Sequence, residues 1–339
     1  MNDKKIAGIV CEYNPFHTGH EYQIKKIREM GYEKIVCVMS GNTVQRGEFA
    51  IADKYARAKT AIECGADLVL ELPYPYSSSG AEFFATAAVK ILSSAGVGTL
   101  CFGSELADID ALTSAARVCE SDVFAEKYKS LASDGLGTAS AYFEAYKFAA
   151  ESLGVDVKAL DGSNDLLGVA YIRAILRNGL NMTPIAIKRE GSAYTDGEIG
   201  VSNGFPSALM IRNALGEGLD KIEKCLPRAS FETISECIAV GNAPCNIKRI
   251  ESAVLAFFRL ADVEALANMN AAEAGGGLAE RLGKCSKTAK SYDELVAMAS
   301  GKKYTESRVR RAILSCMTGA TEEDIRHTPA YSTVLAFND

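Results

Sequence analysis

Two of the three histidines in this 339-residue chain lie within one tetrapeptide, His17-Thr18-Gly19-His20. The tetrapeptide follows an apolar run and a proline-containing loop, and a helix is expected to begin there. A helix N-terminus offers free N–H groups to a phosphate, and Gly19 lets the backbone approach a nucleotide closely. Two imidazoles three positions apart share one face of the first helical turn. They could donate hydrogen bonds to phosphate oxygens and stabilise charge that develops at phosphorus.

A pair of surface or capping histidines is the ordinary alternative to this chemistry, and a metal site is another. A metal site would need a third ligand nearby. His327 lies far away in the sequence, and Glu12 by itself is weak support. The sequence therefore predicts no metal ligand set.

Short β-rich runs alternate with helical stretches through the first half of the chain. A strand–helix–strand repeat about every 30 residues is typical of a parallel sheet covered on both faces. The runs are continuously apolar, as expected for buried strands, and such a sheet binds ligands outside the carboxyl ends of its strands. The fold class expected is α/β. The predicted strands are Lys5–Cys11, Lys34–Met39, Asp67–Leu72, Thr99–Phe102 and Met182–Lys188, and the clearest predicted helices are Tyr55–Glu63 and Ala81–Ser93.

Strand patterns end after about Leu215. From there the chain is interpreted as helices joined by turns marked by glycine or proline. Two domains are therefore expected, an α/β domain over residues 1–215 and a helical domain over residues 216–339.

Composition narrows the class of protein. Hydrophobic residues make up 48% and charged residues 24%, which is typical of a globular protein. The net charge of −6 means that any nucleic-acid binding must come from a local patch. No apolar run reaches the roughly 18 residues of a membrane span, and no signal peptide is evident. Ten cysteines without a C-x-x-C pair indicate buried free thiols in a cytoplasmic protein.

The segment GIVCEYNPFHTGH (Gly8–His20) resembles the H-x-G-H nucleotidylyltransferase superfamily and, more narrowly, the bacterial tRNA(Met) cytidine acetate ligases. Three further blocks are similar to that family, and together they extend the resemblance over residues 8–314. The resemblance implies a Rossmann-like parallel sheet of the nucleotidylyltransferase type with a C-terminal helical domain. The three blocks are Met39–Pro73, Ser163–Ile175 and Lys302–Leu314.

The resemblance also implies a reaction in two steps that uses ATP with Mg²⁺. Acetate attacks the α-phosphate of ATP and gives acetyl-adenylate and pyrophosphate. N4 of the wobble cytidine in elongator tRNA(Met) then attacks the acetyl carbonyl, leaving N4-acetylcytidine and AMP. His17 and His20 are the implied catalytic residues, and they act by positioning and charge stabilisation. The implied partners are acetate and tRNA, and no obligate protein partner is evident.

The ATP site that the resemblance implies comprises the first loop, Gly103, Asn164 and Arg189. Gly103 ends a strand at the edge of the histidines, although a simple turn glycine is the alternative. Asn164 could recognise a base or ribose edge, or cap a helix that starts at Asp165. Arg189 is either a cation for the triphosphate or half of a solvated pair with Lys188. The implied loop residues are Val10, Cys11, Glu12, Tyr13, Asn14, Pro15, Phe16, His17, Thr18, Gly19, His20, Glu21, Tyr22 and Gln23.

Other polar segments leave alternatives open. Ser207 could cap a helix whose N–H groups hold phosphate, with Arg212 neutralising charge. Lys284–Thr288 is similar to the lysine-serine-lysine loop of class I synthetases, but an ordinary basic loop is the simpler interpretation. Arg46 could bind acetate or a phosphate, whereas Arg57 is equally compatible with a solvated helix face.

A basic segment, Lys302–Arg311, holds five basic residues and one acidic residue. Arg308 and Arg311 share a helix face, and Tyr304 is close enough in sequence to stack on an exposed base. A solvated helix end is the alternative, and the family resemblance favours an RNA-binding face. The predicted RNA-binding residues are Lys302, Lys303, Tyr304, Arg308 and Arg311.

Two rival functions are also compatible with the sequence. One is a small-molecule adenylyltransferase of the same superfamily, although such enzymes are commonly shorter and lack a helical domain with a basic patch. The other is a catalytically inactive tRNA-binding relative, against which the intact His17–His20 tetrapeptide argues.

Overall fold

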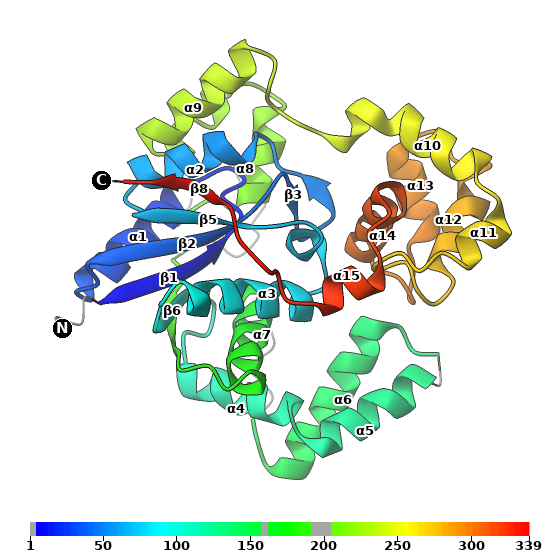
Figure 1. Ribbon diagram of the computed structural model, residues 1–339, viewed down its shortest axis with the longest axis horizontal. Helices are drawn as coiled ribbons and strands as arrows, with labels where there is room; N and C mark the ends of the chain where they lie inside the picture. The colour runs from blue at the N-terminus through cyan, green and yellow to red at the C-terminus, as the bar shows by residue number, and fades with distance from the viewer. Residues whose placement is uncertain (1–4, 134, 157–161, 191–204, 339) are drawn as a thin grey trace.

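The computed structural model describes residues 5–133, 135–156, 162–190 and 205–338. Its centre is a six-stranded sheet with the order β7-β6-β1-β2-β5-β8 (Figure 1). The pairs from β7 to β5 are parallel, and β8 pairs antiparallel with β5 at one edge. The strands are β1 (Ile6–Cys11), β2 (Lys34–Ser40), β5 (Leu68–Leu72), β6 (Thr99–Ser104), β7 (Thr183–Lys188) and β8 (Val334–Phe337).

The α/β class and all five predicted strands are confirmed, with ends that differ by one or two residues. The expectation that strands end after Leu215 is wrong, because β8 returns to the sheet from the end of the chain. Only Leu335 of this four-residue edge strand is buried. An apolar run of four residues is too short for its spacing to distinguish a strand from part of a helix. The domain boundary at residue 215 stays a prediction.

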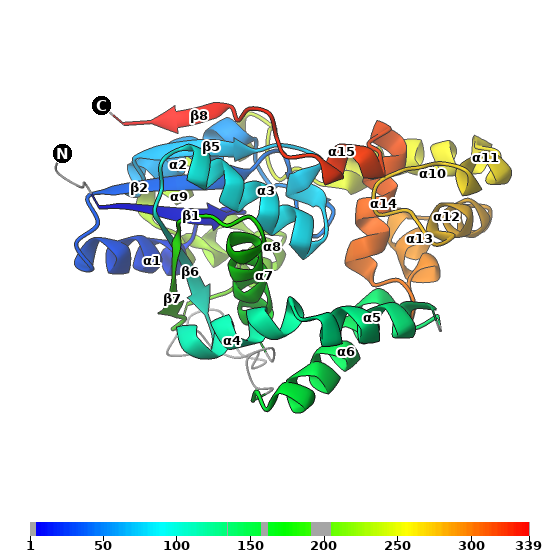
Figure 2. The same ribbon diagram turned by 60° about the horizontal axis from the view of Figure 1, so that its bottom comes forward.

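Helices cover both faces of the sheet. Neighbouring residues of one strand point to opposite faces, and apolar residues on each face are buried against these helices. Cys37 packs with α1 and α2, whereas Val38 packs with α3 and α7. Helices α5 and α6 lie further out, beyond the layers that cover the sheet (Figure 2). These helices are α1 (Thr18–Glu29), α2 (Lys54–Glu63), α3 (Ala81–Ser94), α4 (Ile109–Cys119), α5 (Asp122–Ser133), α6 (Thr138–Leu153) and α7 (Ser163–Arg177).

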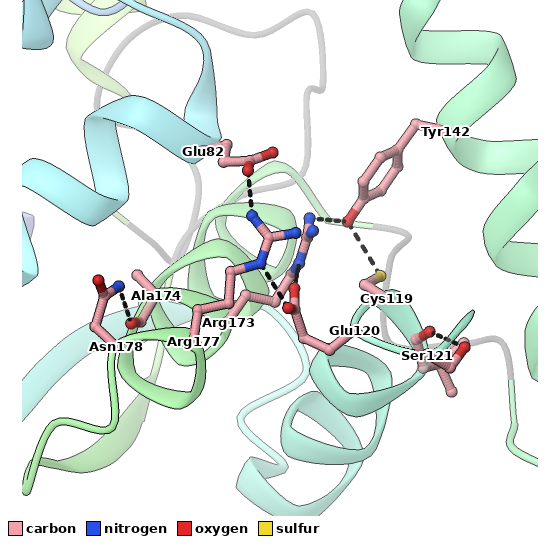
Figure 3. Close-up of polar contacts among 10 residues, drawn as sticks. Glu82, Cys119, Glu120, Ser121, Tyr142, Arg173, Ala174, Arg177 and Asn178 are labelled. Atoms are coloured by element: carbon pink, nitrogen blue, oxygen red, sulfur yellow. Dashed lines mark hydrogen bonds and ion pairs between the residues drawn. The ribbon is translucent and has the colours of Figure 1, made fainter. Parts of the chain in front are cut away.

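An arginine pair on α7 joins it to three other helices (Figure 3). Arg173 is 7% exposed, and it donates to Glu120 at 2.7 Å and to the Tyr142 hydroxyl at 3.1 Å. Arg177 donates to the other oxygen of Glu120 at 2.5 Å and pairs with Glu82 of α3. A buried guanidinium without such partners would be costly. The network therefore holds α3, α4 and α6 against α7, whose first turn lies at the site described below.

The rest of the chain forms a second helical group and two smaller contacts. Helices α10 to α14 enclose their own apolar cluster, which includes Phe258, Leu282 and Val309. Helix α9 packs on α2, and the short β3–β4 hairpin lies between the sheet and α14 (Figure 1). These elements are β3 (Thr43–Val44), β4 (Glu48–Phe49), α8 (Ala208–Leu215), α9 (Arg228–Ala239), α10 (Glu251–Leu260), α11 (Val263–Ala267), α12 (Leu278–Ser286), α13 (Tyr292–Ala299), α14 (Glu306–Thr318) and α15 (Glu322–Arg326).

All ten cysteines carry free thiols, as predicted, and six of them are buried. Burial raises the pKa of Cys101 and Cys316 to about 12, so both stay protonated and unreactive at neutral pH. In the described ranges, no helix combines the length and the apolar character that crossing a membrane requires.

Candidate active site

The order in which the chain adds parallel strands to the sheet reverses between β1 and β6. The chain adds β2 and β5 on one side of β1, and later β6 and β7 on the other side. At such a switch point the loops that leave two adjacent strands diverge, and a crevice opens between them. The loop after β1 leads to His17, and Gly103 is the penultimate residue of β6. The fold therefore brings both predicted elements to one crevice.

His17 and His20 close the N-terminus of α1. The Nδ1 atom of His17, the N-cap, accepts the Gly19 backbone N–H at 3.0 Å, and His20 Nδ1 accepts the His17 backbone N–H at 3.1 Å. This is a capping box in which imidazoles take the places of the usual hydroxyl and carboxylate. The two rings stack with their centroids 3.7 Å apart. Capping therefore occupies the Nδ1 atoms and leaves the Nε2 atoms for another partner.

Burial keeps both imidazoles uncharged. The His17 residue is 5% exposed, and burial, followed by the charge of Arg189, lowers its pKa to about 3. Burial, His17 and Arg189 together lower the pKa of His20 well below its ordinary value. Since each Nδ1 accepts a hydrogen bond, each neutral ring carries its proton on Nε2. The pair consequently presents two neutral N–H donors.

Two buried aromatic side chains pack against the ring of His20. The rings of Tyr13 and Phe16 lie 4.9 Å and 5.5 Å from the ring of His20, and both residues are 1% exposed. Tyr13 has a φ of +45°, a left-handed conformation that is uncommon for a large side chain. From α9, the Ser230 hydroxyl donates to the Phe16 carbonyl at 2.6 Å. These contacts fix the loop that ends in His17.

At two positions of the pocket beside the histidines, glycine keeps the backbone close to a neighbouring side chain. A Cβ on Gly19 would lie 2.8 Å from the His17 ring, and one on Gly103 would lie 3.2 Å from the Arg189 side chain. Both predicted glycines therefore allow close approach. The pocket is lined by the predicted residues His17, Gly19, His20, Tyr22, Gln23, Gly103 and Arg189, together with Ile187, Lys188, Glu190 and Phe205.

Glu105, which is not among the residues predicted from the sequence, holds Asn164 beside Arg189. Glu105 accepts the backbone N–H groups of Asn164 and Asp165, each at 3.1 Å, and the side-chain amide of Asn164. Arg189 donates to Asn164 Oδ1 at 3.5 Å. The alternative in which Asn164 caps the helix is wrong, because α7 begins at Ser163 and Glu105 receives its N–H groups. Only the fold shows this, since Glu105 lies 59 residues before Asn164.

Helix α8 contacts the first loop from another side. Ser207 is its N-cap and accepts the Met210 N–H at 3.2 Å, as expected for a capping serine. Arg212 donates to the Asn14 carbonyl at 2.9 Å. Asn14 in turn accepts the Ile51 N–H at 2.8 Å. Ser207 and Arg212 are thus placed beside the loop, and phosphate contact by either stays a prediction.

Arg57 is a structural cation, and the solvated alternative is wrong. It is 2% exposed and donates to the carbonyls of Glu12 and Ala52 at 2.5 Å and 3.0 Å, and to that of Ser40 at 3.0 Å. Burial lowers the pKa of its guanidinium to about 10, so it remains charged at neutral pH. Burial also raises the pKa of Glu12. Arg57 therefore joins the start of the loop that follows β1 to the end of β2.

The lysine-serine-lysine segment belongs to the helical group around α12. Lys284 forms an ion pair with Glu280, and Lys287 Nζ donates to the Arg259 carbonyl at 2.6 Å. Both partners lie within that same group of helices. The contacts favour the ordinary basic loop over an ATP-binding role.

Tyr304 is not a surface platform. It is 5% exposed, and its hydroxyl donates to the Gly276 carbonyl. The prediction that it stacks on a base is therefore wrong for this conformation, because apolar packing against the helical cluster covers its ring. Lys302 and Lys303 are exposed, and Lys303 Nζ donates to the Gly276 carbonyl at 2.9 Å.

Arg308 and Arg311 share one helix face as predicted, but that face contacts the protein. Arg308 donates to the Glu273 carbonyl at 3.2 Å and to Thr138 Oγ1 at 3.0 Å. The Arg311 side chain is 13% exposed, and it contacts the Glu273 carboxylate at 3.2 Å and the Gln45 carbonyl at 3.3 Å. Their contacts are thus largely internal, and RNA contact by these two arginines stays untested.

The fold and the site define a class of nucleotide-transferring protein, and comparison with known proteins agrees. The family model described as HIGH Nucleotidyl Transferase matches residues 4–339. A tRNA(Met) cytidine acetate ligase of Acetivibrio thermocellus is 33% identical over 351 residues, covering 98% of this chain and 83% of the relative. One from Caldicellulosiruptor saccharolyticus is 35% identical, with 98% and 82% covered. The chain therefore belongs to the tRNA(Met) cytidine acetate ligase family.

Solved structures show the same likeness. Thermotoga maritima TmcAL bound with alpha-thio ATP has a TM-score of 0.88 at 33% identity, with 98% of this chain and 80% of that chain covered. The apo form I of the same protein has a TM-score of 0.91 at 33% identity, with 98% and 81% covered. The similarity thus extends over nearly the whole described fold.

Proposed function

We propose that this protein activates acetate with ATP as acetyl-adenylate and transfers the acetyl group to N4 of the wobble cytidine of elongator tRNA(Met). The observation that carries the proposal is the pair of neutral histidines at the switch point beside Arg189. Membership of the ligase family and the likeness to a TmcAL bound with alpha-thio ATP support the substrates. Action on tRNA makes the cytoplasm the expected compartment.

In the first step, an acetate oxygen attacks the α-phosphorus of ATP, and the bond from that phosphorus to the bridging oxygen of pyrophosphate breaks. Negative charge spreads over the phosphate oxygens as this happens. The Nε2–H groups of His17 and His20 and the guanidinium of Arg189 supply donors for that charge. Mg²⁺, which the phosphates of ATP largely hold, would supply further charge neutralisation.

Neutral donors suit this step for a physical reason. A buried imidazolium would be costly next to Arg189, and burial has already removed that charge. The capping hydrogen bonds hold both rings before substrate arrives, so no reorganisation is needed when charge develops. The chain thus acts by orienting substrates and stabilising charge, without a covalent nucleophile.

In the second step, N4 of the cytidine attacks the acetyl carbonyl carbon, the bond from that carbon to the oxygen of AMP breaks, and N4 loses a proton. We assign RNA contact to Lys302 and Lys303, which are exposed. Arg308 and Arg311 rank behind them, because each is only partly exposed and donates to two or more groups of the protein, whereas Lys303 Nζ donates to one, the Gly276 carbonyl. Lysines contact phosphates as point charges.

Labelled acetate, ATP with Mg²⁺ and bacterial tRNA that lacks the modification test the proposal. Label that enters RNA only with ATP, and that nuclease digestion locates on cytidine, would support it. ATP cleavage to AMP with another small acceptor, but no labelled RNA, would instead indicate a small-molecule adenylyltransferase. Binding of tRNA without any turnover would indicate an inactive relative.

A further inference from the structure

The β3–β4 hairpin is held on two sides by the backbone of Gln45. Its N–H donates to the Glu12 carboxylate at 2.9 Å, and its carbonyl accepts from Arg311 of α14 at 3.3 Å. Glu12 directly follows β1 and starts the loop that ends in His17. A single residue of the hairpin thus joins the helical group to this loop, residues 12–17, which we call the ATP-site loop.

The turn of this hairpin is seated on the backbone of α14. Gly47 has a φ of +77°, and a Cβ there would lie 2.5 Å from the backbone nitrogen of Arg311. No side chain fits in that space, and an L-residue would be strained at that φ. Two residues further on, Phe49 packs against the apolar cluster of α10 to α14. The hairpin is therefore packed directly on α14.

A second connection runs through the Glu48 carboxylate, which lies between two arginines. Arg310 of α14 is 3.5 Å away on one side, and Arg212 is 3.9 Å away on the other. Arg212 also donates to Asn14 of the ATP-site loop at 2.9 Å. The side chains of Arg310 and Arg212 are 24% and 18% exposed, so solvent screens these charges only in part.

We infer that the β3–β4 hairpin couples the position of the helical group to the ATP-site loop, with Arg310 and Arg311 as positioning residues for the adenylation step. The inference rests on the proposed function for the identity of that step. Although both arginines lie in the basic segment, their inferred role is to hold the ATP-site loop in place through the hairpin. Two contacts enter the loop, at Glu12 and at Asn14, on either side of Tyr13.

The structure offers a matched pair of variants for a test. Arg310 contacts Glu48 of the hairpin and also Glu306, one turn earlier on its own helix, at 2.8 Å. Glu48→Gln removes the charge that joins α14 to the hairpin. Glu306→Gln removes the other acidic partner of Arg310 without touching the hairpin, and an i,i+4 ion pair along one helix contributes little. Comparison of the two isolates the connection to the hairpin.

Amide hydrogen exchange on the full-length protein measures the coupling without reference to activity. Glu48→Gln should speed exchange about three- to tenfold both in the hairpin and in the peptide that covers residues 12–20, a size typical of coupling between linked elements. Glu306→Gln should change either peptide by less than about twofold. Faster exchange in the hairpin alone, or the same change in both variants, would overturn the inference.

Acetate-dependent exchange between ATP and pyrophosphate, measured without tRNA, gives the second readout. Glu48→Gln and Arg311→Ala should lower kcat about three- to tenfold, with the KM for ATP and the tRNA affinity changed less, and Arg311→Lys should restore part of the loss. A loss of tRNA affinity with unchanged exchange kinetics would return the arginines to RNA binding. If the unmodified protein shows no acetate-dependent exchange, the proposed function fails, whereas hydrogen exchange still decides the coupling.

Discussion

Replacement of His17 separates its two roles, because one atom of its ring caps α1 and another is left to donate to substrate. Nδ1 accepts the Gly19 N–H at 3.0 Å. Asparagine is among the best N-cap residues, so the amide oxygen that His17→Asn introduces can replace Nδ1 as the acceptor. The same amide has no group at the position of Nε2–H. His17→Ala removes both functions, so the two variants differ in helix capping and share the loss of the donor.

The expected magnitudes follow from those roles. Loss of one charge-stabilising donor lowers the rate by about 10²–10³, or roughly 3–4 kcal/mol. Loss of an N-cap costs about 1 kcal/mol of the free energy of unfolding. Both variants should therefore lose the rate, whereas only His17→Ala should also lose about 1 kcal/mol through its cap.

The assays are acetate-dependent exchange of pyrophosphate into ATP, denaturant unfolding, and tRNA binding. Both variants should bind tRNA as the unmodified protein does, because His17 lines the pocket at the switch point, away from the exposed lysines proposed to contact RNA. Exchange by His17→Asn within about threefold of the unmodified rate would refute the donor role, since removing a donor of this kind costs far more. A parallel loss of tRNA affinity would equally show that the residue does not act on adenylation alone.

Three further predictions concern pH, the nucleotide contacts and the RNA. Since burial lowers the pKa of His17 from 6.5 to about 3, the unfolded chain binds more protons between those values, so Tm should fall as pH drops from about 6.5 toward 3. The exchange rate, by contrast, should show no histidine titration near pH 6.5. Glu105→Ala releases Asn164 and Arg189 and should weaken ATP binding about tenfold, measured by calorimetry, whereas equal affinity would show that the carboxylate does not position them. Lys302→Ala with Lys303→Ala should weaken tRNA binding and reduce its salt slope by about 1–2, with adenylation unchanged; an unaltered slope would remove both lysines from the interface.

Local pattern was enough to predict the centre of this protein. Apolar runs and their spacing located β1, β2, β5, β6 and β7, and the position of His17–His20 after the first strand placed the site at the carboxyl edge of the sheet. Such signals are local, because the apolar pattern of a strand and the cap of a helix are set by residues within a few positions of one another. The family resemblance rested on the same contiguous blocks.

Long-range contacts decided the rest. Glu105 reaches Asn164 across 59 residues, and Arg311 reaches Gln45 across 266. Tyr304 lies in a basic segment, yet its ring is packed inside the helical cluster. Whether a polar or aromatic side chain faces solvent depends on which distant element covers it, and the spacing of neighbours does not carry that information. The sequence by itself determined the strands and the loop that carries the candidate site, and only the tertiary structure decided which of the predicted side chains are engaged within the protein and which are exposed.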